Sequence, residues 1–217
     1  RVVHGEVAIG FAGLGNPRKL TGHKGLSSHT HGDCGILGMG CSGNHLQPVA
    51  RHLIPRATDH NAAIGGQVFA SATRSIPITS NSATSIFFGD VVKLNSSGTL
   101  DKDAGTSSAT PVGVFLGCSY TDPTFGKTFR QFYAANTVAS DIVAFVQDDP
   151  DALYKVAVVS ATTTIGYVNR TAVGNNAVLV QNTGSTTTGN SAVAIDDTTA
   201  TTSTFPIRII DVISETQ

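Results

Sequence analysis

The chain has no tryptophan, and beyond Asn61 it also has no histidine and no methionine, with a single cysteine (Cys118) and a single glutamate (Glu215). This larger part therefore lacks most of the side chains that act as acids, bases, nucleophiles or metal ligands near neutral pH. It is rich instead in Thr, Ser, Val, Ile, Ala, Gly and Asn, which are typical of strands and turns. The composition favours a scaffold or a binding surface, and we predict that the protein is not an enzyme.

Charge and long apolar runs are also scarce. Only 13% of the 217 residues are charged, about half the usual share, and the formal net charge of −1 does not indicate nucleic acid or an anionic membrane as a partner. No apolar run approaches the roughly 18 residues of a membrane helix. No signal-peptide pattern follows Arg1, which predicts synthesis in a cytoplasm. A surface with few charges and many hydroxyl groups suits contacts with other proteins.

The composition changes between about Leu46 and Asn61. Residues 1–60 are rich in glycine, contain all seven histidines and show no sustained period of 2 or 3.6. This composition predicts an extended, mostly irregular N-terminal arm and lead-in. We expect the arm to pack against the body of its own chain or against a neighbouring subunit. Residues 61–217 predict a β-rich body.

From Ile76 onward, short β-branched runs alternate with turn residues. This pattern predicts an all-β fold, with a β-sandwich or barrel-like body. Three stretches rich in Thr, Ser and Gly (160–164, 184–190 and 198–204) predict exposed loops or edge strands, and the best helix candidate is Ala134–Asp141. The predicted strands are 76–78, 86–88, 91–94, 112–116, 142–146, 153–159, 177–180, 192–195 and 207–213, with turns at 95–98, 122–123, 148–151, 182–184 and 188–190.

Zinc binding is the sharpest chemical hypothesis for the arm. His and Cys are zinc ligands, and the arm places five of them close together in the sequence: His29, His31, Cys34, Cys41 and His45. No Cys-x-x-Cys occurs, the two cysteines are seven residues apart, and the spacing matches no zinc module. We therefore favour ordinary loop residues with free thiols, as in a reducing cytosol, and predict no metal site. The sequence leaves metal binding by these residues open.

Two enzyme signatures are also weak. The segment 13–17, GLGNP, resembles the opening of peptidyl-tRNA hydrolases, in which His23 or His29 would be a general base, but a β body follows it. A catalytic triad in the arm would use residues that only a fold could bring together: Ser27 or Ser28, His29 and Asp33. We predict no catalytic residue and no cofactor.

Two features of the body have a functional and a structural interpretation. The segment 148–151, DDPD, could chelate calcium, but its spacing is not that of an EF-hand and it is common turn chemistry, which we favour. An aromatic and basic cluster at 125–133 resembles a surface that binds nucleic acid. We favour the alternative interpretation, a hydrophobic loop packed on the core or on a partner. Its members are Phe125, Lys127, Phe129, Arg130, Phe132 and Tyr133.

Four segments carry a family resemblance. They are ITSNSATSIFFGDVVKL (78–94), ATPVGVFLGCSYTDP (109–123), VASD (138–141) and DDPDALY (148–154). Over 76–212 the chain resembles a group of tailed-bacteriophage virion proteins, the head decoration and capsid structural proteins. Residues 1–45 match nothing in the group, and 46–53 only echo its usual opening.

The resemblance implies a capsid decoration, or cement, protein. Such a protein would be made in the host cytoplasm, bind the outer surface of the virion capsid with the major capsid protein as partner, and bridge neighbouring capsomers as a homotrimer. It would bind neither nucleic acid nor a membrane. The alternatives are another virion component (shell, tail or fibre), a zinc-binding or hydrolytic protein that uses the His/Cys arm, and a cell-surface adhesion module. A major shell protein is disfavoured because no long helix is predicted.

Overall fold

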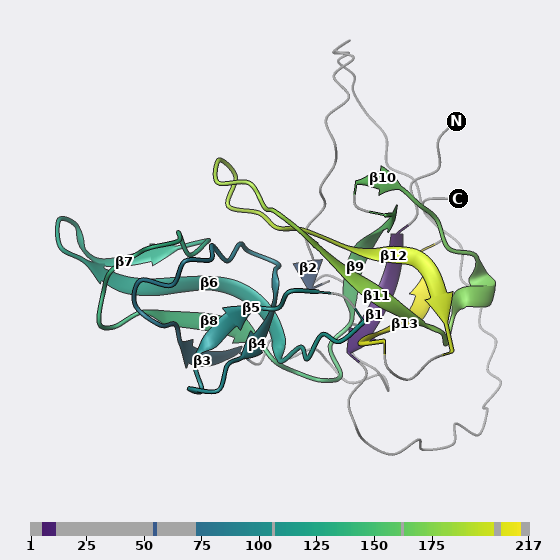
Figure 1. Ribbon diagram of the computed structural model, residues 1–217, viewed down its shortest axis with the longest axis horizontal. Coiled ribbons are helices and arrows are strands. Elements are labelled where there is room, and N and C mark those ends of the chain that lie inside the picture. The colour runs from purple at the N-terminus through teal and green to yellow at the C-terminus, as the bar shows by residue number, and fades with distance from the viewer. Residues whose placement is uncertain are drawn as a thin grey trace, which may run out of the picture. The chain divides into compact units, whose positions relative to one another are not determined.

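In the computed structural model the described part of the chain is built from β-strands in two sheets (Figure 1). The structure describes residues 6–11, 54–55, 73–105, 107–161, 163–201 and 205–213. These residues contain thirteen strands and one short 3₁₀ helix, η1 (Arg170–Ala172). The all-β prediction is confirmed. No helix in the described ranges is long and apolar enough to cross a membrane.

The first sheet closes into a ring of five strands. Strand β1 pairs with β13 on one side and with β9 on the other, and β11 and β12 complete the circuit. All neighbours in the ring are antiparallel except β12 and β9. Two short strands, β2 (Ile54–Pro55) and β10 (Thr164–Ile165), also pair with β9. The ring strands are β1 (Glu6–Phe11), β9 (Tyr154–Ser160), β11 (Asn176–Asn182), β12 (Ala192–Ala200) and β13 (Ile207–Val212).

Alternating apolar residues fill the ring. Successive side chains of a strand point to opposite faces, so every second residue of a ring strand faces the interior. On β9 these are Tyr154, Val156 and Val158, and each is buried. Strand β11 follows the same period, whereas a register shift in the pairing of β1 with β13 brings Ile207, Ile209 and Val212 of β13 to the core. The interior is therefore a packed core. Its buried members include Val7, Ile9, Ala177, Leu179, Val193, Ile195, Ile207 and Ile209.

Strand β1 belongs to the segment 1–60, which was predicted to form an extended, mostly irregular arm and lead-in. Residues 6–11 of this segment form a strand that lies between β9 and β13 in the ring. Val7 and Ile9 are fully buried there. The strand is short and ends at a glycine-rich stretch, so its period of two covers too few residues to stand out in the sequence. The remainder of 1–60, apart from β2, lies outside the described residues.

The second sheet carries five strands in the order β3-β8-β6-β4-β5, and β7 pairs with β6. Its core holds Phe115, Cys118, Tyr133, Ala144 and Val146, among others. A register shift in β6 between Phe115 and Gly117 changes the alternation, so both Phe115 and Cys118 reach this core. The strands are β3 (Thr73–Pro77), β4 (Val91–Leu94), β5 (Leu100–Lys102), β6 (Gly113–Asp122), β7 (Gly126–Arg130) and β8 (Val143–Gln147).

The predicted helix at 134–141 does not form. Asn136 has a φ of 61°, in the left-handed region, and the Thr137 hydroxyl donates to the Ala134 carbonyl at 2.7 Å. The segment instead bonds to a neighbouring loop, because the backbone N–H groups of Asn81 and Asn136 donate to Thr137 and Ser82 carbonyls, both at 2.8 Å. A residue in the left-handed region with a local side-chain bond reverses the chain and ends helical propagation.

A buried ion pair lies where the two sheets meet. The Asp90 carboxylate is fully buried; it accepts the Phe87 backbone N–H at 2.8 Å and lies 3.1 Å from Lys102 Nζ. The same ammonium group donates to the Asn182 carbonyl of β11 at 3.3 Å. Lys102 thus connects the second sheet to the ring. Burial raises the pKa of Asp90 above its ordinary value, and the Lys102 charge lowers it in part.

Gln181 of β11 makes a second link between the sheets. Its amide nitrogen donates to the carbonyls of Val91 at 2.7 Å and Asp103 at 2.8 Å. The buried Asp103 carboxylate in turn accepts the backbone N–H groups of Gly105 and Thr110. The Val91 carbonyl also accepts the Asp103 backbone N–H at 3.0 Å, so Val91, Asp103 and Gln181 form one hydrogen-bonded group. The two sheets are therefore joined by specific polar contacts as well as by apolar packing.

Replacing Ile9 by alanine tests the closure of the ring by β1. We expect Ile9→Ala to lower the free energy of unfolding by about 2–5 kcal/mol, because the substitution leaves a cavity in a packed core. The matched control is Ile165→Ala on β10, where the side chain is 51% exposed, and its effect should stay within about 0.5 kcal/mol. Urea unfolding followed by circular dichroism measures both. Equal effects of the two substitutions would contradict the placement of β1.

Replacing Lys102 by methionine tests the buried ion pair. We expect Lys102→Met to destabilise the protein by about 3–5 kcal/mol at neutral pH, since it leaves the Asp90 carboxylate buried without a counter-charge. The double variant Asp90→Asn/Lys102→Met should recover most of this loss, as urea unfolding would show. If both variants are equally unstable, the loss comes from packing and not from the charge.

The same pair of variants gives the pH dependence. The pKa of Asp90 is raised in the folded state, so its stabilising contribution is present below the ordinary value of 3.8 and is lost as the pH rises through the folded-state pKa. Lys102→Met should raise that pKa further. The stability deficit of the single variant relative to the double variant should therefore shrink as the pH falls.

Candidate binding surface

The predicted zinc, hydrolase and triad residues all lie outside the described residues. These are His23, Ser27, Ser28, His29, His31, Asp33, Cys34, Cys41, His45 and the segment 13–17. Within the described ranges, no three His, Cys, Asp or Glu side chains gather where they could hold a metal ion. A candidate functional site in this part of the chain must therefore be sought among its surfaces.

The acidic segment 148–151 forms a turn, as favoured from the sequence. The Asp151 backbone N–H donates to Asp149 Oδ1 at 2.9 Å, and the Ala152 N–H donates to the Asp149 carbonyl at 3.2 Å. Asp148 forms an ion pair with Arg74 of β3 at 2.9 Å. Asp149 thus stabilises the turn, and Asp148 contacts a neighbouring strand. Their arrangement gives no support to the calcium hypothesis.

The aromatic cluster at 125–133 divides into a buried and an exposed part. Tyr133 is fully buried, and Phe132 stacks on Phe87 with ring centroids 5.5 Å apart. Phe125 and Phe129, in contrast, are 77% and 70% exposed. Phe132 and Tyr133 thus pack inside the protein, as predicted for this cluster. Phe125 and Phe129 instead present large apolar side chains to the outside. We call residues 125–130 the β7 edge.

The β7 edge is the free side of a hairpin. Strand β7 pairs with β6 from Cys118↔Arg130 to Asp122↔Gly126, and no other described strand pairs with it (Figure 1). Its outward backbone N–H and C=O groups can therefore accept a further strand. Phe129 stacks on Phe145 of β8, with centroids 6.4 Å apart and an interplanar angle of 14°. This contact fixes the Phe129 ring while most of its surface stays exposed.

Two carboxylates hold the hairpin in shape. At the tip, Asp122 Oδ1 accepts the backbone N–H groups of Thr124 at 2.8 Å and Phe125 at 3.1 Å. At its side, Asp141 accepts the Thr121 N–H at 2.8 Å, the Thr121 hydroxyl at 2.7 Å and Lys127 Nζ at 3.0 Å. The exposed phenylalanines are thus held on an ordered support, which reduces the entropy lost on binding.

The bonds to Asp141 also shift its ionisation. They hold the pKa of the Asp141 carboxyl well below its ordinary value, with the Thr121 N–H and hydroxyl as the largest causes, followed by Lys127. Because the pKa is lower in the folded state, the carboxylate stabilises the hairpin above the ordinary value of 3.8. This contribution is lost as the pH falls through the folded-state pKa.

Cys118, the one cysteine of the body, belongs to the core. It is buried and free, and its thiol lies 3.7 Å from the Phe132 carbonyl. Burial raises the pKa of the thiol to about 11. The thiolate is the reactive form of cysteine, so this side chain is kept unreactive at neutral pH.

Comparison of the chain with protein-family models, with curated proteins and with solved structures finds no match. The candidate surface is therefore defined by its own geometry.

Part of this surface could have been found in the sequence. The predicted turn at 122–123 is followed by alternating side chains, GKTFR over 126–130, which is the pattern of the second strand of a hairpin. We grouped the segment by its aromatic and basic residues instead and missed β7. The support from Asp141 could not be predicted, because it comes from a segment 20 residues away from Thr121.

Replacing Thr121 by valine tests the support of the hairpin. Thr121→Val removes the hydroxyl donor and keeps the backbone N–H, so we expect the pKa of Asp141 to rise but to remain below 3.8. A carbon-13 NMR titration of the carboxyl group measures this change. Thr128→Val on β7 is the matched control, since its hydroxyl donates to the Gly126 carbonyl and not to Asp141. An unchanged Asp141 titration in Thr121→Val would exclude the hydroxyl bond.

Proposed function

We propose that the protein is a tailed-bacteriophage head decoration (cement) protein. It binds the outer surface of the capsid shell and bridges neighbouring capsomers, with the major capsid protein as its partner. The resemblance of residues 76–212 to that group of virion proteins supports this proposal. The structural observation that favours it is the β7 edge, a supported strand that presents Phe125 and Phe129 to the outside.

Such an edge has the properties of a protein-binding surface. Exposed aromatic side chains are enriched in interfaces, and full burial of one phenylalanine stabilises a contact by roughly 1.5–3 kcal/mol. The free edge of β7 adds backbone groups that can pair with a strand of the partner. Arg130 is also exposed and gives the surface a positive charge that an acidic partner would complement.

Each such contact is modest, and we propose that symmetry multiplies it. A homotrimer presents three copies of the same edge to a shell with local three-fold symmetry. Once one copy is bound, the others bind at a high effective concentration, so the assembly holds more tightly than a single edge would. This arrangement would let a small protein bridge several capsomers without a large single interface.

Binding to shells tests the function. The protein is mixed with expanded shells of the major capsid protein of the same virus, and bound copies are counted by quantitative mass spectrometry. We expect a fixed, simple ratio to the major capsid protein. Phe125→Ser/Phe129→Ser should bind at least tenfold more weakly, because about 1.4 kcal/mol corresponds to a factor of ten.

The matched control is Tyr167→Ser on the ring, where the aromatic side chain is 69% exposed. It should bind as the unchanged protein does. Absence of binding would overturn the proposal, and equal weakening by both variants would exclude the β7 edge as the contact. A handful of copies in purified virus particles would indicate a tail or fibre component instead.

A further inference from the structure

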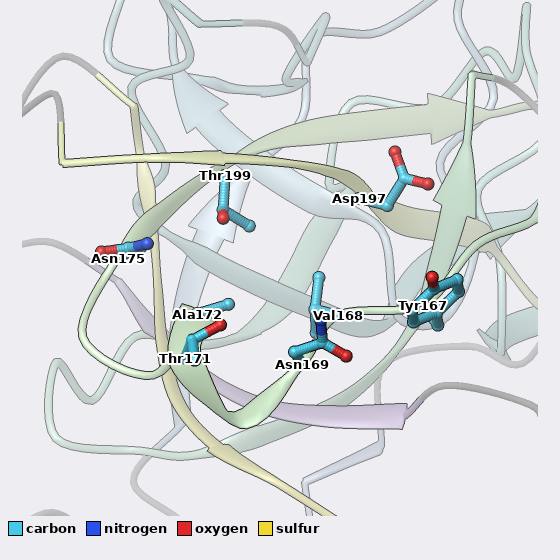
Figure 2. Close-up of a pocket in the computed structure, with 8 residues that line it drawn as sticks. All are labelled: Tyr167, Val168, Asn169, Thr171, Ala172, Asn175, Asp197 and Thr199. Atoms are coloured by element: carbon cyan, nitrogen blue, oxygen red, sulfur yellow. The ribbon is translucent and has the colours of Figure 1, made fainter.

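A hollow of about 320 Å³ lies on the ring, between the segment 167–175 and strand β12. Figure 2 shows Tyr167 and Asp197 at one end of it and Asn175 at the other. Small-ligand sites range over about 300–1,000 Å³, so the hollow has room for a ligand of the size of a mono- or disaccharide. The lining residues are Tyr167, Val168, Asn169, Thr171, Ala172, Asn175, Asp197 and Thr199.

The backbone around the hollow is fixed at both ends. The Gly166 N–H donates to the Val158 carbonyl of β9 at 3.1 Å, and the Gly174 N–H donates to the Ile209 carbonyl of β13 at 2.9 Å. The Ile209 N–H donates to the Asn175 carbonyl at 3.0 Å. Gly166 is also packed so closely that a Cβ atom would lie 2.9 Å from the Asp197 carboxylate. The site is thus formed before any ligand binds, which favours affinity.

The side chains at the hollow are polar. Asn169, Thr171, Asn175, Asp197 and Thr199 supply amides, hydroxyls and one carboxylate. Amide and hydroxyl groups both donate and accept hydrogen bonds, and a carboxylate accepts them. They can therefore donate to and accept from the hydroxyl groups of a ligand.

The charges at the hollow disfavour an anion. Asp197 is the one ionisable carboxylate among the lining residues, and no lining residue is cationic. The nearest cation along the chain, Arg170, forms an ion pair with Asp211 at 3.0 Å. A phosphate or sulfate group would meet the Asp197 charge without compensation. A neutral ligand with many hydroxyl groups fits better.

Tyr167 adds an apolar platform. Its side chain is 69% exposed and lies at the rim of the hollow, on the side of Asp197 (Figure 2). An aromatic ring of this kind packs against the C–H face of a sugar ring, while the hydroxyl groups around the sugar reach the polar side chains. The combination of one exposed aromatic ring with amide, hydroxyl and carboxylate groups is what a pyranose requires.

We propose that this hollow is a binding site for a neutral saccharide, with Tyr167 as the stacking platform. Asp197 accepts a sugar hydroxyl, and Asn169 and Asn175 each donate and accept through their amides. The inference goes beyond the decoration function and does not rest on it, because no residue of the β7 edge lines the hollow.

Nuclear magnetic resonance titration tests the site. Nitrogen-15 spectra of the protein are recorded with methyl glycosides of glucose, galactose, mannose and N-acetylglucosamine at millimolar concentrations. We expect at least one glycoside to shift the amides of Tyr167, Asn169 and Asn175. Tyr167→Ala should weaken this binding at least tenfold, Asp197→Asn several-fold, and Tyr167→Phe little, because the phenyl ring keeps the platform.

Phe125→Ala, an exposed aromatic on the second sheet, is the matched control and should leave the titration unchanged. The proposal is overturned if no glycoside shifts these amides, or if the shifts persist in Tyr167→Ala. It is also overturned if tetramethylammonium shifts them and the glycosides do not, since Tyr167 and Asp197 would then form a cation site. None of these results depends on binding to shells.

Discussion

The buried carboxylate of Asp90 organises the contact between the two sheets. It is fully buried, and Lys102 supplies the charge that makes its burial tolerable. The ion pair lies within the second sheet, and the same Lys102 ammonium also reaches the Asn182 carbonyl of β11 in the ring. A buried ion pair contributes little net stability, but loss of either partner leaves a buried charge uncompensated. The bond from Lys102 to Asn182 adds a directional contact between the sheets to their apolar packing.

The ring depends on residues from both ends of the described chain. Strand β1, at residues 6–11, pairs with β13, at residues 207–212, so its closure brings together positions that are far apart in the sequence. Closing so long a loop is entropically unfavourable, and the buried pairs Val7 with Val212 and Ile9 with Ile209 must offset it. The ring also positions the polar hollow, because β9 and β13 fix the backbone on either side of Tyr167–Asn175. Formation of the hollow therefore depends on these two ring strands.

Local patterns in the sequence predicted most of the strands and little of the sites. The strands at 91–94, 153–159 and 207–213 were predicted because each is a short run rich in β-branched residues that turn residues separate from the next run. Each of these runs corresponds to a strand. Strand β1 was missed because its period is short, and Ala134–Asp141 was misjudged because a left-handed Asn136 reverses the chain. The partners of Gln181 lie 78 and 90 residues away. Neither this link nor the hollow has a signature within one window of sequence, since each is made by segments that only the fold brings together.

An exposed aromatic strand edge can also promote aggregation, and the charged residues of this edge reduce that tendency. A free strand edge invites pairing with any extended chain, and large apolar side chains strengthen such contacts. Strand β7 is only five residues long and places Lys127 and Arg130 on either side of Phe129 in the sequence. Charges in such positions discourage indiscriminate pairing. Lys127 is engaged by Asp141, whereas Arg130 is exposed. A strand that pairs with this edge would therefore need apolar side chains and a carboxylate, which limits indiscriminate pairing.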